Sequence, residues 1–268
     1  MLLKKLILPI AMLGVLTACD DIAADDRYQY LEPIEPRRVV LLEEYTGQLC
    51  VNCPDAHNII EQLDQQYHDF IPVSFHCGGP AFSIQQNDPA WGGIVGLATP
   101  LSEQYGAAAG VTNALPKGRV DRIGALENPP QWAEAVRRQM VIDTEVQMIP
   151  YGYLTDDNTI LFQVNMISNL PLDNARLQLW VVENDIKALQ MMPDGSVNMD
   201  YVHNNVFRAD VNGFGGEPIS LQAGVYCSKD YTIDVAPEWV GENLSIVAFI
   251  YNDTGVLQAT RVSFKRSK

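Results

Sequence analysis

The chain is short of basic residues and of cysteine, and each shortage excludes a class of protein. Its 268 residues include 18 Lys and Arg against 33 Asp and Glu, a formal net charge of −15. With no basic excess to neutralise phosphates, the composition argues against sequence-independent nucleic-acid binding and against docking on anionic lipid by charge alone. Five cysteines are too few for a miniprotein built on disulfides. The composition, 47% hydrophobic and 19% charged, instead predicts a globular chain long enough for one large domain or two.

The apolar run near the start is too short to be a transmembrane helix. Residues 6–18 make 13 residues, whereas crossing a bilayer takes roughly 20. Lys4 and Lys5 precede this run and small residues end it, which is typical of a secretory signal. The run closes on Leu-Thr-Ala-Cys, which resembles a bacterial lipobox. We therefore predict a signal peptide over residues 1–18 and a lipidated Cys19 as the first residue of the mature protein.

An acidic tether is predicted over residues 19–38. Asp20, Asp21, Asp25 and Asp26 follow the lipid attachment site, and two prolines follow later. These charges are interpreted as a solvated linker or as a surface-export signal, because they resemble the tethers of Bacteroidetes surface lipoproteins. Lipidation would place the folded part outside the cytoplasm, where disulfides persist.

Two domains are predicted after the tether. Residues 39–45 and 70–75 have the pattern of buried strands, and residues 54–67 between them have helical spacing. A short helix over 101–109, a strand over 119–122 and a helix over 130–141 complete an α/β domain at 39–144. From residue 145 to 268 about seven short strands, separated by turn residues and without a convincing helix, predict a β-sandwich of immunoglobulin size.

Cys50 and Cys53 carry the strongest chemical signal. They form a CxxC pair that follows a strand and opens a helix. Backbone N–H groups at a helix start stabilise a thiolate, so an exposed Cys50 is the predicted nucleophile and Cys53 the resolving thiol. A zinc site is the weaker interpretation, because the nearby His57, His76 and Cys77 do not follow at a zinc-finger spacing.

The segment from Glu43 to Pro54, EEYTGQLCVNCP, resembles the active-site segment of extracytoplasmic thioredoxin-like proteins. Together with the lipobox and the β-domain, the whole chain is similar to the outer-membrane protein 28 family of Bacteroidetes lipoproteins. The resemblance implies a thioredoxin-like fold over residues 39–142. Within it Pro116 is the cis-proline beside the CxxC, Leu115 offers backbone hydrogen bonds to a bound peptide, and Glu44 is the buried carboxylate that takes the proton of Cys53.

The sequence also departs from that pattern. Cys53 and Pro116 are 63 residues apart, so residues 78–110 are predicted to be an insertion that covers or flanks the site. Val51 and Asn52 match neither the reductase nor the strong-oxidant dipeptide, which leaves the redox direction open. Cys77 and Cys227 could form a disulfide between the domains or remain free thiols, or Cys77 could be a further redox partner.

The predicted fold class is thus an α/β thioredoxin-like domain followed by an all-β immunoglobulin-like sandwich. The predicted function is thiol–disulfide exchange on envelope proteins at the outer membrane, with the membrane reached through Cys19. The alternative is a non-catalytic surface lipoprotein in which the CxxC pair is a structural disulfide and the β-domain binds an unidentified partner. No nucleotide, metalloprotease, hydrolase or calcium motif occurs, so no cofactor or metal is expected. His203, a lone histidine in a polar stretch, is expected to be exposed.

Overall fold

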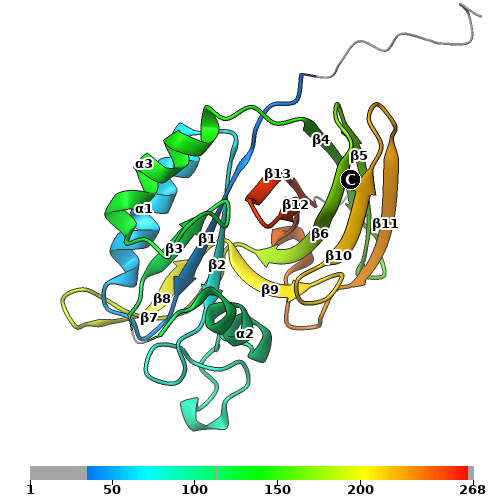
Figure 1. Cartoon of the computed structure of the whole chain (residues 1–268). Coiled ribbons are helices and arrows are strands. Elements are labelled where there is room, and N and C mark those ends of the chain that lie inside the picture. Colours follow the sequence, from blue (N-terminus) through cyan, green and yellow to red (C-terminus); the bar gives the residue numbers. More distant parts are fainter. Residues whose placement is uncertain (1–34, 113, 265–268) are drawn as a thin grey trace, which may run out of the picture. The chain divides into compact units, whose positions relative to one another are not determined.

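The computed structural model describes residues 35–112 and 114–264, and these residues belong to one compact, mainly β unit (Figure 1). The predicted signal peptide, Cys19 and most of the predicted tether lie outside the described residues. The structural description therefore begins at the end of the tether.

The first half alternates strands and helices as the sequence predicts. Its elements are β1 (Val40–Thr46), α1 (Cys53–Gln66), β2 (Phe70–His76), the 3-10 helix η2 (Pro89–Trp91), α2 (Pro100–Ala109), β3 (Lys117–Val120) and α3 (Pro129–Met140). Prolines stand in the first turns of all three α-helices, where the missing N–H costs no intrahelical bond.

The second half is built from strands, and its described residues hold no α-helix. They are β4 (Val146–Leu154), β5 (Thr159–Ser168), β6 (Leu172–Glu183), β7 (Ile186–Met191), β8 (Val197–His203), β9 (Val206–Asp210), β10 (Glu217–Leu221), β11 (Cys227–Asp234), β12 (Leu244–Asn252) and β13 (Gly255–Ser263), with a 3-10 helix η3 (Gly241–Asn243) before β12. The sequence predicts about seven of these strands; β7, β8 and β10 are the ones it misses.

One eight-stranded sheet runs through both halves. Its order is β13-β12-β6-β9-β2-β1-β3, and β10 pairs with β6. The step between the halves is the parallel pairing of Ser74 with Val206, where the Ser74 N–H donates to the Asn205 carbonyl at 2.7 Å. Strand pairing therefore crosses the boundary that the sequence predicts near residue 145.

Helices cover one face of the β2-β1-β3 end of this sheet. α1 and α3 lie side by side in Figure 1, and Ile60, Leu63 and Trp132 pack on Val40 and Leu42 of β1. The opposite face of β1 meets a second cluster that includes Phe75, Trp180, Phe207 and Phe249, which come from both halves of the chain. Burial on both faces accounts for the absence of polar–apolar alternation in β1.

The far part of the long sheet packs against a separate three-stranded sheet. That sheet has the order β11-β5-β4, and its buried residues share one core with β6, β10 and β12. Two sheets face to face around an apolar core are the arrangement that the turn-rich strand pattern predicts.

The strand pairing and shared core predict that the two halves stay together after the chain is cut between them. Val141 and Ile142 are 81% and 46% exposed, so a specific protease site can be inserted there. Because the β2–β9 pairing, the Arg38 bond to the Val256 carbonyl and the Val256 N–H bond to the Asp121 carbonyl join the halves, the two fragments should co-elute on gel filtration and separate only in denaturant. Separation under native conditions would show that the halves are independent bodies.

Candidate functional site

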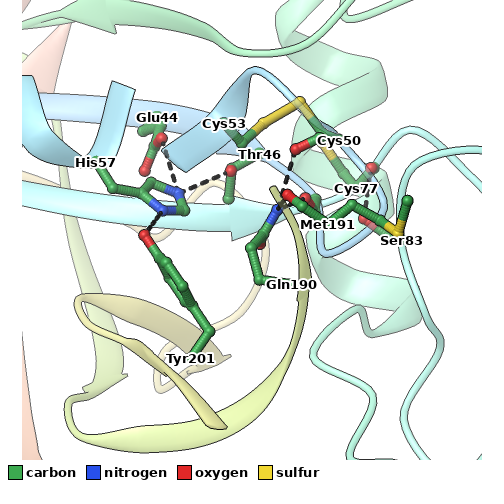
Figure 2. Close-up of a disulfide and its surroundings, with 11 residues drawn as sticks. Glu44, Thr46, Cys50, Cys53, His57, Cys77, Ser83, Gln190, Met191 and Tyr201 are labelled. Carbon is green, nitrogen blue, oxygen red and sulfur yellow. Dashed lines mark hydrogen bonds and ion pairs between the residues drawn. A yellow bond between two sulfur atoms is a disulfide. The ribbon is translucent and has the colours of Figure 1, made fainter. Parts of the chain in front are cut away.

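The CxxC turn lies between β1 and α1 and is closed by a disulfide. Cys50 and Cys53 are bonded, with Cα atoms 5.5 Å apart, and the Cys53 N–H donates to the Cys50 carbonyl at 3.2 Å (Figure 2). Cys53 is the first residue of α1, while Cys50 precedes the N-cap Asn52. The pairing at a strand-to-helix junction is the one that the sequence predicts.

The sulfur pair is covered, which corrects the expectation of an exposed Cys50. Cys50 is 4% exposed and Cys53 0%. On one side the Leu49 N–H donates to the Phe82 carbonyl at 2.8 Å. On the other side Gln190 of β7 donates through Nε2 to the Cys50 carbonyl at 3.0 Å. The turn is thus held between the segment that follows β2 and the β7–β8 hairpin.

Glu44 is buried in the middle of β1, on the face that packs against α1. Its side chain is 0% exposed, and the Ser74 hydroxyl donates to its Oε2 at 2.5 Å. Burial raises the pKa of this carboxyl from 4.5 to about 8, against the smaller opposing effect of the Ser74 hydrogen bond. Glu44 is therefore predominantly protonated at neutral pH.

His57 lies one helical turn after Cys53 and connects Glu44 to the β7–β8 hairpin. Its Nε2 is 3.0 Å from Thr46 Oγ1 and 3.4 Å from Glu44 Oε1, and its Nδ1 is 2.8 Å from the Tyr201 hydroxyl (Figure 2). Burial, with His203 nearby, lowers the pKa of His57 to about 3. The ring is therefore neutral at physiological pH, with one nitrogen able to accept and the other able to donate.

These side chains line a polar cavity of about 320 Å³. Three of the four histidines of the chain border it: His57, His76 and His203. His203 is 2% exposed, contrary to expectation, because the hairpin brings its ring centroid to 5.3 Å from that of His76. Neither ring nitrogen of His76 has a hydrogen-bond partner among the residues that the structure describes. The lining residues are Glu44, His57, Asn58, Ile60, Glu61, Asp64, Ser74, His76, Asn184, Asp185, Tyr201, Val202, His203, Asn204, Asn205 and Arg261.

Pro116 lies at a second cavity, beside the start of α1. The Leu115–Pro116 peptide bond is cis, as the resemblance implies. The cavity has a volume of about 340 Å³, and its walls include Asn52 and Ala56 of the CxxC region together with Pro129 at the start of α3. Pro116 therefore faces the same helix terminus that carries Cys53.

The two remaining cysteines in the described part of the chain are free thiols. Cys77 is buried and Cys227 is partly buried, so the inter-domain disulfide left open by the sequence does not form. Burial, with Glu103 and Glu44 nearby, raises the pKa of Cys77 to about 12, which keeps this thiol protonated. No group of three or more His, Cys, Asp or Glu among the described residues is arranged to hold a metal ion.

Comparison with known proteins identifies the family. The model of the outer membrane protein Omp28 family matches residues 102–268, more than half of the chain. The chain belongs to the Omp28 family. Family membership assigns the protein to the outer membrane, as predicted, and no helix in residues 35–112 or 114–264 is long and apolar enough to cross a bilayer. The CxxC pair precedes the matched residues. No curated protein matches this chain.

Two solved structures of Porphyromonas gingivalis proteins resemble this Omp28 family member. HBP35 is 15% identical, with 87% of this chain and 77% of that chain covered at a TM-score of 0.65. A domain of the outer membrane lipoprotein Omp28 is 23% identical, with 46% of this chain and 89% of that chain covered at a TM-score of 0.35. The likeness to HBP35 shows a shared fold.

The site residues that come from the β7–β8 hairpin are not predicted from the sequence. Gln190 and Tyr201 lie in β7 and β8, and the turn between these strands carries a recognisable Pro193-Asp194-Gly195 signal. The sequence indicates His57 only as a weak zinc-ligand candidate, although its position four residues after Cys53 places it on the same helix face.

The Glu44 pKa predicts that stability falls as pH rises from about 7 to about 8, above the range in which the buried histidines titrate in the unfolded chain. The folded protein holds a proton up to about pH 8 that the unfolded chain, with a pKa of 4.5, releases earlier. The contribution of Glu44 to the free energy of unfolding is fully present below the unfolded pKa and is lost as pH rises through the folded pKa. The contribution is at most about 5 kcal/mol. Glu44→Gln should remove this slope from the free energy of unfolding, measured by urea titration at several pH values.

Glu134→Gln is the matched control, because the Glu134 side chain is 68% exposed. This variant should keep the wild-type slope. An unchanged slope in Glu44→Gln would show that Glu44 is ionised in the folded protein.

Proposed function

We propose that the Cys50–Cys53 pair performs thiol–disulfide exchange on envelope proteins. The observation that carries the proposal is the grouping of three features at one helix terminus. They are the CxxC disulfide, the buried acid Glu44 behind α1, and the cis peptide bond before Pro116. The first two are what such a reaction requires, a reversible sulfur pair and a nearby proton acceptor.

The fold around the pair supports a thioredoxin-like interpretation. β1 lies between the parallel β2 and the antiparallel β3, and α1 and α3 cover one face. The resemblance of residues 39–142 to thioredoxin-like proteins gives Cys50, Cys53, Glu44 and Pro116 their roles. For residues 145–268 we propose an immunoglobulin-like sandwich, which the two packed sheets support.

In the reducing direction, the Cys50 thiolate attacks a partner disulfide. The new Cys50–partner bond forms while the other partner sulfur leaves as a thiolate. Cys53 then gives its proton to the ionised Glu44 and attacks the Cys50 sulfur, which restores the Cys50–Cys53 disulfide and releases the second partner thiolate. The partner gains two electrons and the CxxC pair loses two; the oxidising direction is the reverse.

The burial of Cys50 favours a second candidate function. At 4% exposure, Cys50 can attack a partner only after residues 78–84 or the β7–β8 hairpin move aside. If they do not move, the disulfide only fastens the turn between β1 and α1. The protein would then be a binding lipoprotein whose β-domain contacts a surface partner.

A trapping experiment separates the two functions. In Cys53→Ser the resolving attack is lost, so a mixed disulfide at Cys50 should last more than about 100-fold longer than in the wild type. The reason is that a thiol from another molecule attacks the mixed disulfide far more slowly than the neighbouring Cys53 does. The probe is glutathione disulfide added to the reduced protein, followed by intact-mass measurement. Envelope extracts should in addition give adducts that dithiothreitol releases.

Cys227→Ser is the control for this experiment, since Cys227 is a free thiol away from the CxxC turn. It should behave as the wild type at the CxxC turn, and Cys50→Ser should form no adduct in that segment. Peptide mapping separates Cys50 adducts from those on the free thiols Cys77 and Cys227. If Cys53→Ser forms no adduct at Cys50 while it remains folded, the disulfide is structural and exchange is ruled out.

We further propose that the protein is anchored by a lipid on Cys19, on the evidence of the lipobox. Mass spectrometry of the mature protein should show a lipid-modified Cys19 as its first residue. Cys19→Ala should leave the membrane fraction, whereas Cys227→Ser should stay there. Retention of an unlipidated Cys19→Ala protein would contradict the anchor.

A further inference from the structure

The Glu44 side chain has no exposed surface, although it borders the polar cavity. Oε1 of Glu44 is buried and has no hydrogen-bond partner among the described residues. In the proposed exchange reaction Glu44 must be ionised before it can take the Cys53 proton, yet at neutral pH it holds a proton of its own. That proton can leave through a neighbouring group that accepts at one atom and donates at another, or directly to water in the cavity that Glu44 borders.

His57 and Tyr201 form a path that begins within ion-pair distance of Glu44 and continues through a hydrogen bond. His57 Nε2 faces Glu44 Oε1 at 3.4 Å and Thr46 Oγ1 at 3.0 Å, while Nδ1 lies 2.8 Å from the Tyr201 hydroxyl. His57 and Tyr201 both line the cavity of about 320 Å³, a volume that would hold roughly ten waters at their liquid density. The path therefore ends where water can take the proton.

We propose that His57 and Tyr201 are the proton exit of Glu44. The Glu44 carboxyl gives its proton to Nε2 of the neutral His57 ring, Nδ1 gives its own to the Tyr201 hydroxyl, and Tyr201 passes one to water in the cavity. The return path restores the ring to its first tautomer. No electrons move, and one proton leaves Glu44 for each proton that reaches water. This inference deepens the proposed exchange reaction and depends on it for its biological use.

The pKa values of the groups along this path favour passing the proton on, because none of these groups stays charged at neutral pH. Burial lowers the pKa of His57 to about 3 and that of His203 to about 4, and it holds the pKa of His76 well below its usual range. Burial, with Glu44 and Glu61 nearby, raises the pKa of Tyr201 to about 12. Each group thus returns to its neutral form after the proton has passed. The charged side chains facing the cavity are Glu61 and Asp64 from α1, Asp185 before β7, and Arg261 from β13.

Ser74 is the competing route. Its hydroxyl donates to Glu44 Oε2 at 2.5 Å, and the residue also lines the cavity. Ser74 is 3% exposed, so a proton leaving through it would still need to cross buried surface. A decisive test must compare the two routes in the same protein.

The experiment follows the Glu44 proton itself and needs no redox partner. The full-length disulfide form is taken by stopped flow from about pH 6 to about pH 10, on either side of the carboxyl pKa. Infrared spectroscopy records the loss of the protonated carboxyl C=O band, assigned by its absence in Glu44→Gln. Tyr201→Phe and His57→Gln should each slow this loss by about 10-fold or more. Tyr226→Phe and His68→Gln, which change residues outside the cavity, should keep the wild-type rate.

Each outcome decides the proposal. Wild-type rates in both Tyr201→Phe and His57→Gln would overturn it, and slowing in Ser74→Ala alone would assign the exit to Ser74. Tyr201→Phe removes one hydroxyl from a partly exposed side chain, so it tests the path even if His57→Gln fails to fold. Slow deprotonation in a protein that never forms mixed disulfides would uphold the exit and reject the exchange function. Wild-type deprotonation rates in His57→Gln and Tyr201→Phe, in a protein that does form mixed disulfides, would reject the proton exit and uphold the exchange function.

Discussion

The burial of β1 on both of its faces is the constraint from which the site follows. All seven residues from Val40 to Thr46 are buried, between the α1–α3 layer and the aromatic cluster. Two consecutive residues of this strand, Glu43 and Glu44, therefore lose their water on opposite faces of the sheet. A buried carboxyl must be paired with a cation or take up a proton. Glu43 is paired with a cation, whereas Glu44 takes up a proton.

Glu43 is paired, and its partner holds the two halves of the protein together. Arg122 Nε lies 2.7 Å from Glu43 Oε1. The same guanidinium stacks over three aromatic rings from the second half, with its centre 4.4 Å from the Tyr251 centroid, 4.8 Å from that of Phe249 and 5.3 Å from that of Trp180. A charge of the α/β part is thus neutralised within the aromatic packing of the β part. The boundary near residue 145 is therefore crossed by side-chain packing as well as by the β2–β9 strand pairing.

Local patterns in the sequence predict most of the first half of the fold. Apolar runs, helical spacing and the CxxC position identify β1, α1 and β2 and the candidate cysteines, and the resemblance to thioredoxin-like proteins identifies Glu44 and the cis bond at Pro116. The β7–β8 hairpin is not predicted, although residues 197–201 alternate apolar and polar side chains. That alternation marks no buried face, because Val197 to Asp200 are all exposed. Contacts such as Gln190 with Cys50 join residues 140 positions apart, and no local pattern encodes them. The sequence therefore predicts the CxxC pair but not the β7–β8 hairpin that buries it.

The β7–β8 hairpin contributes to the protonation states of the side chains that line the cavity. The hairpin contacts His57 through Tyr201 and places His203 beside His76. Burial keeps all three rings neutral at physiological pH. Glu44 is kept neutral by the same burial, but its pKa of about 8 lies far closer to physiological pH than those of the histidines or of Tyr201. Among the cavity groups with shifted pKa values, Glu44 is thus the one whose charge changes near physiological pH. The hairpin contacts the Cys50 carbonyl through Gln190, and it supplies Tyr201 to the proposed path of the Glu44 proton. One element therefore controls both the exposure of the Cys50 sulfur and the exit of the Glu44 proton to solvent.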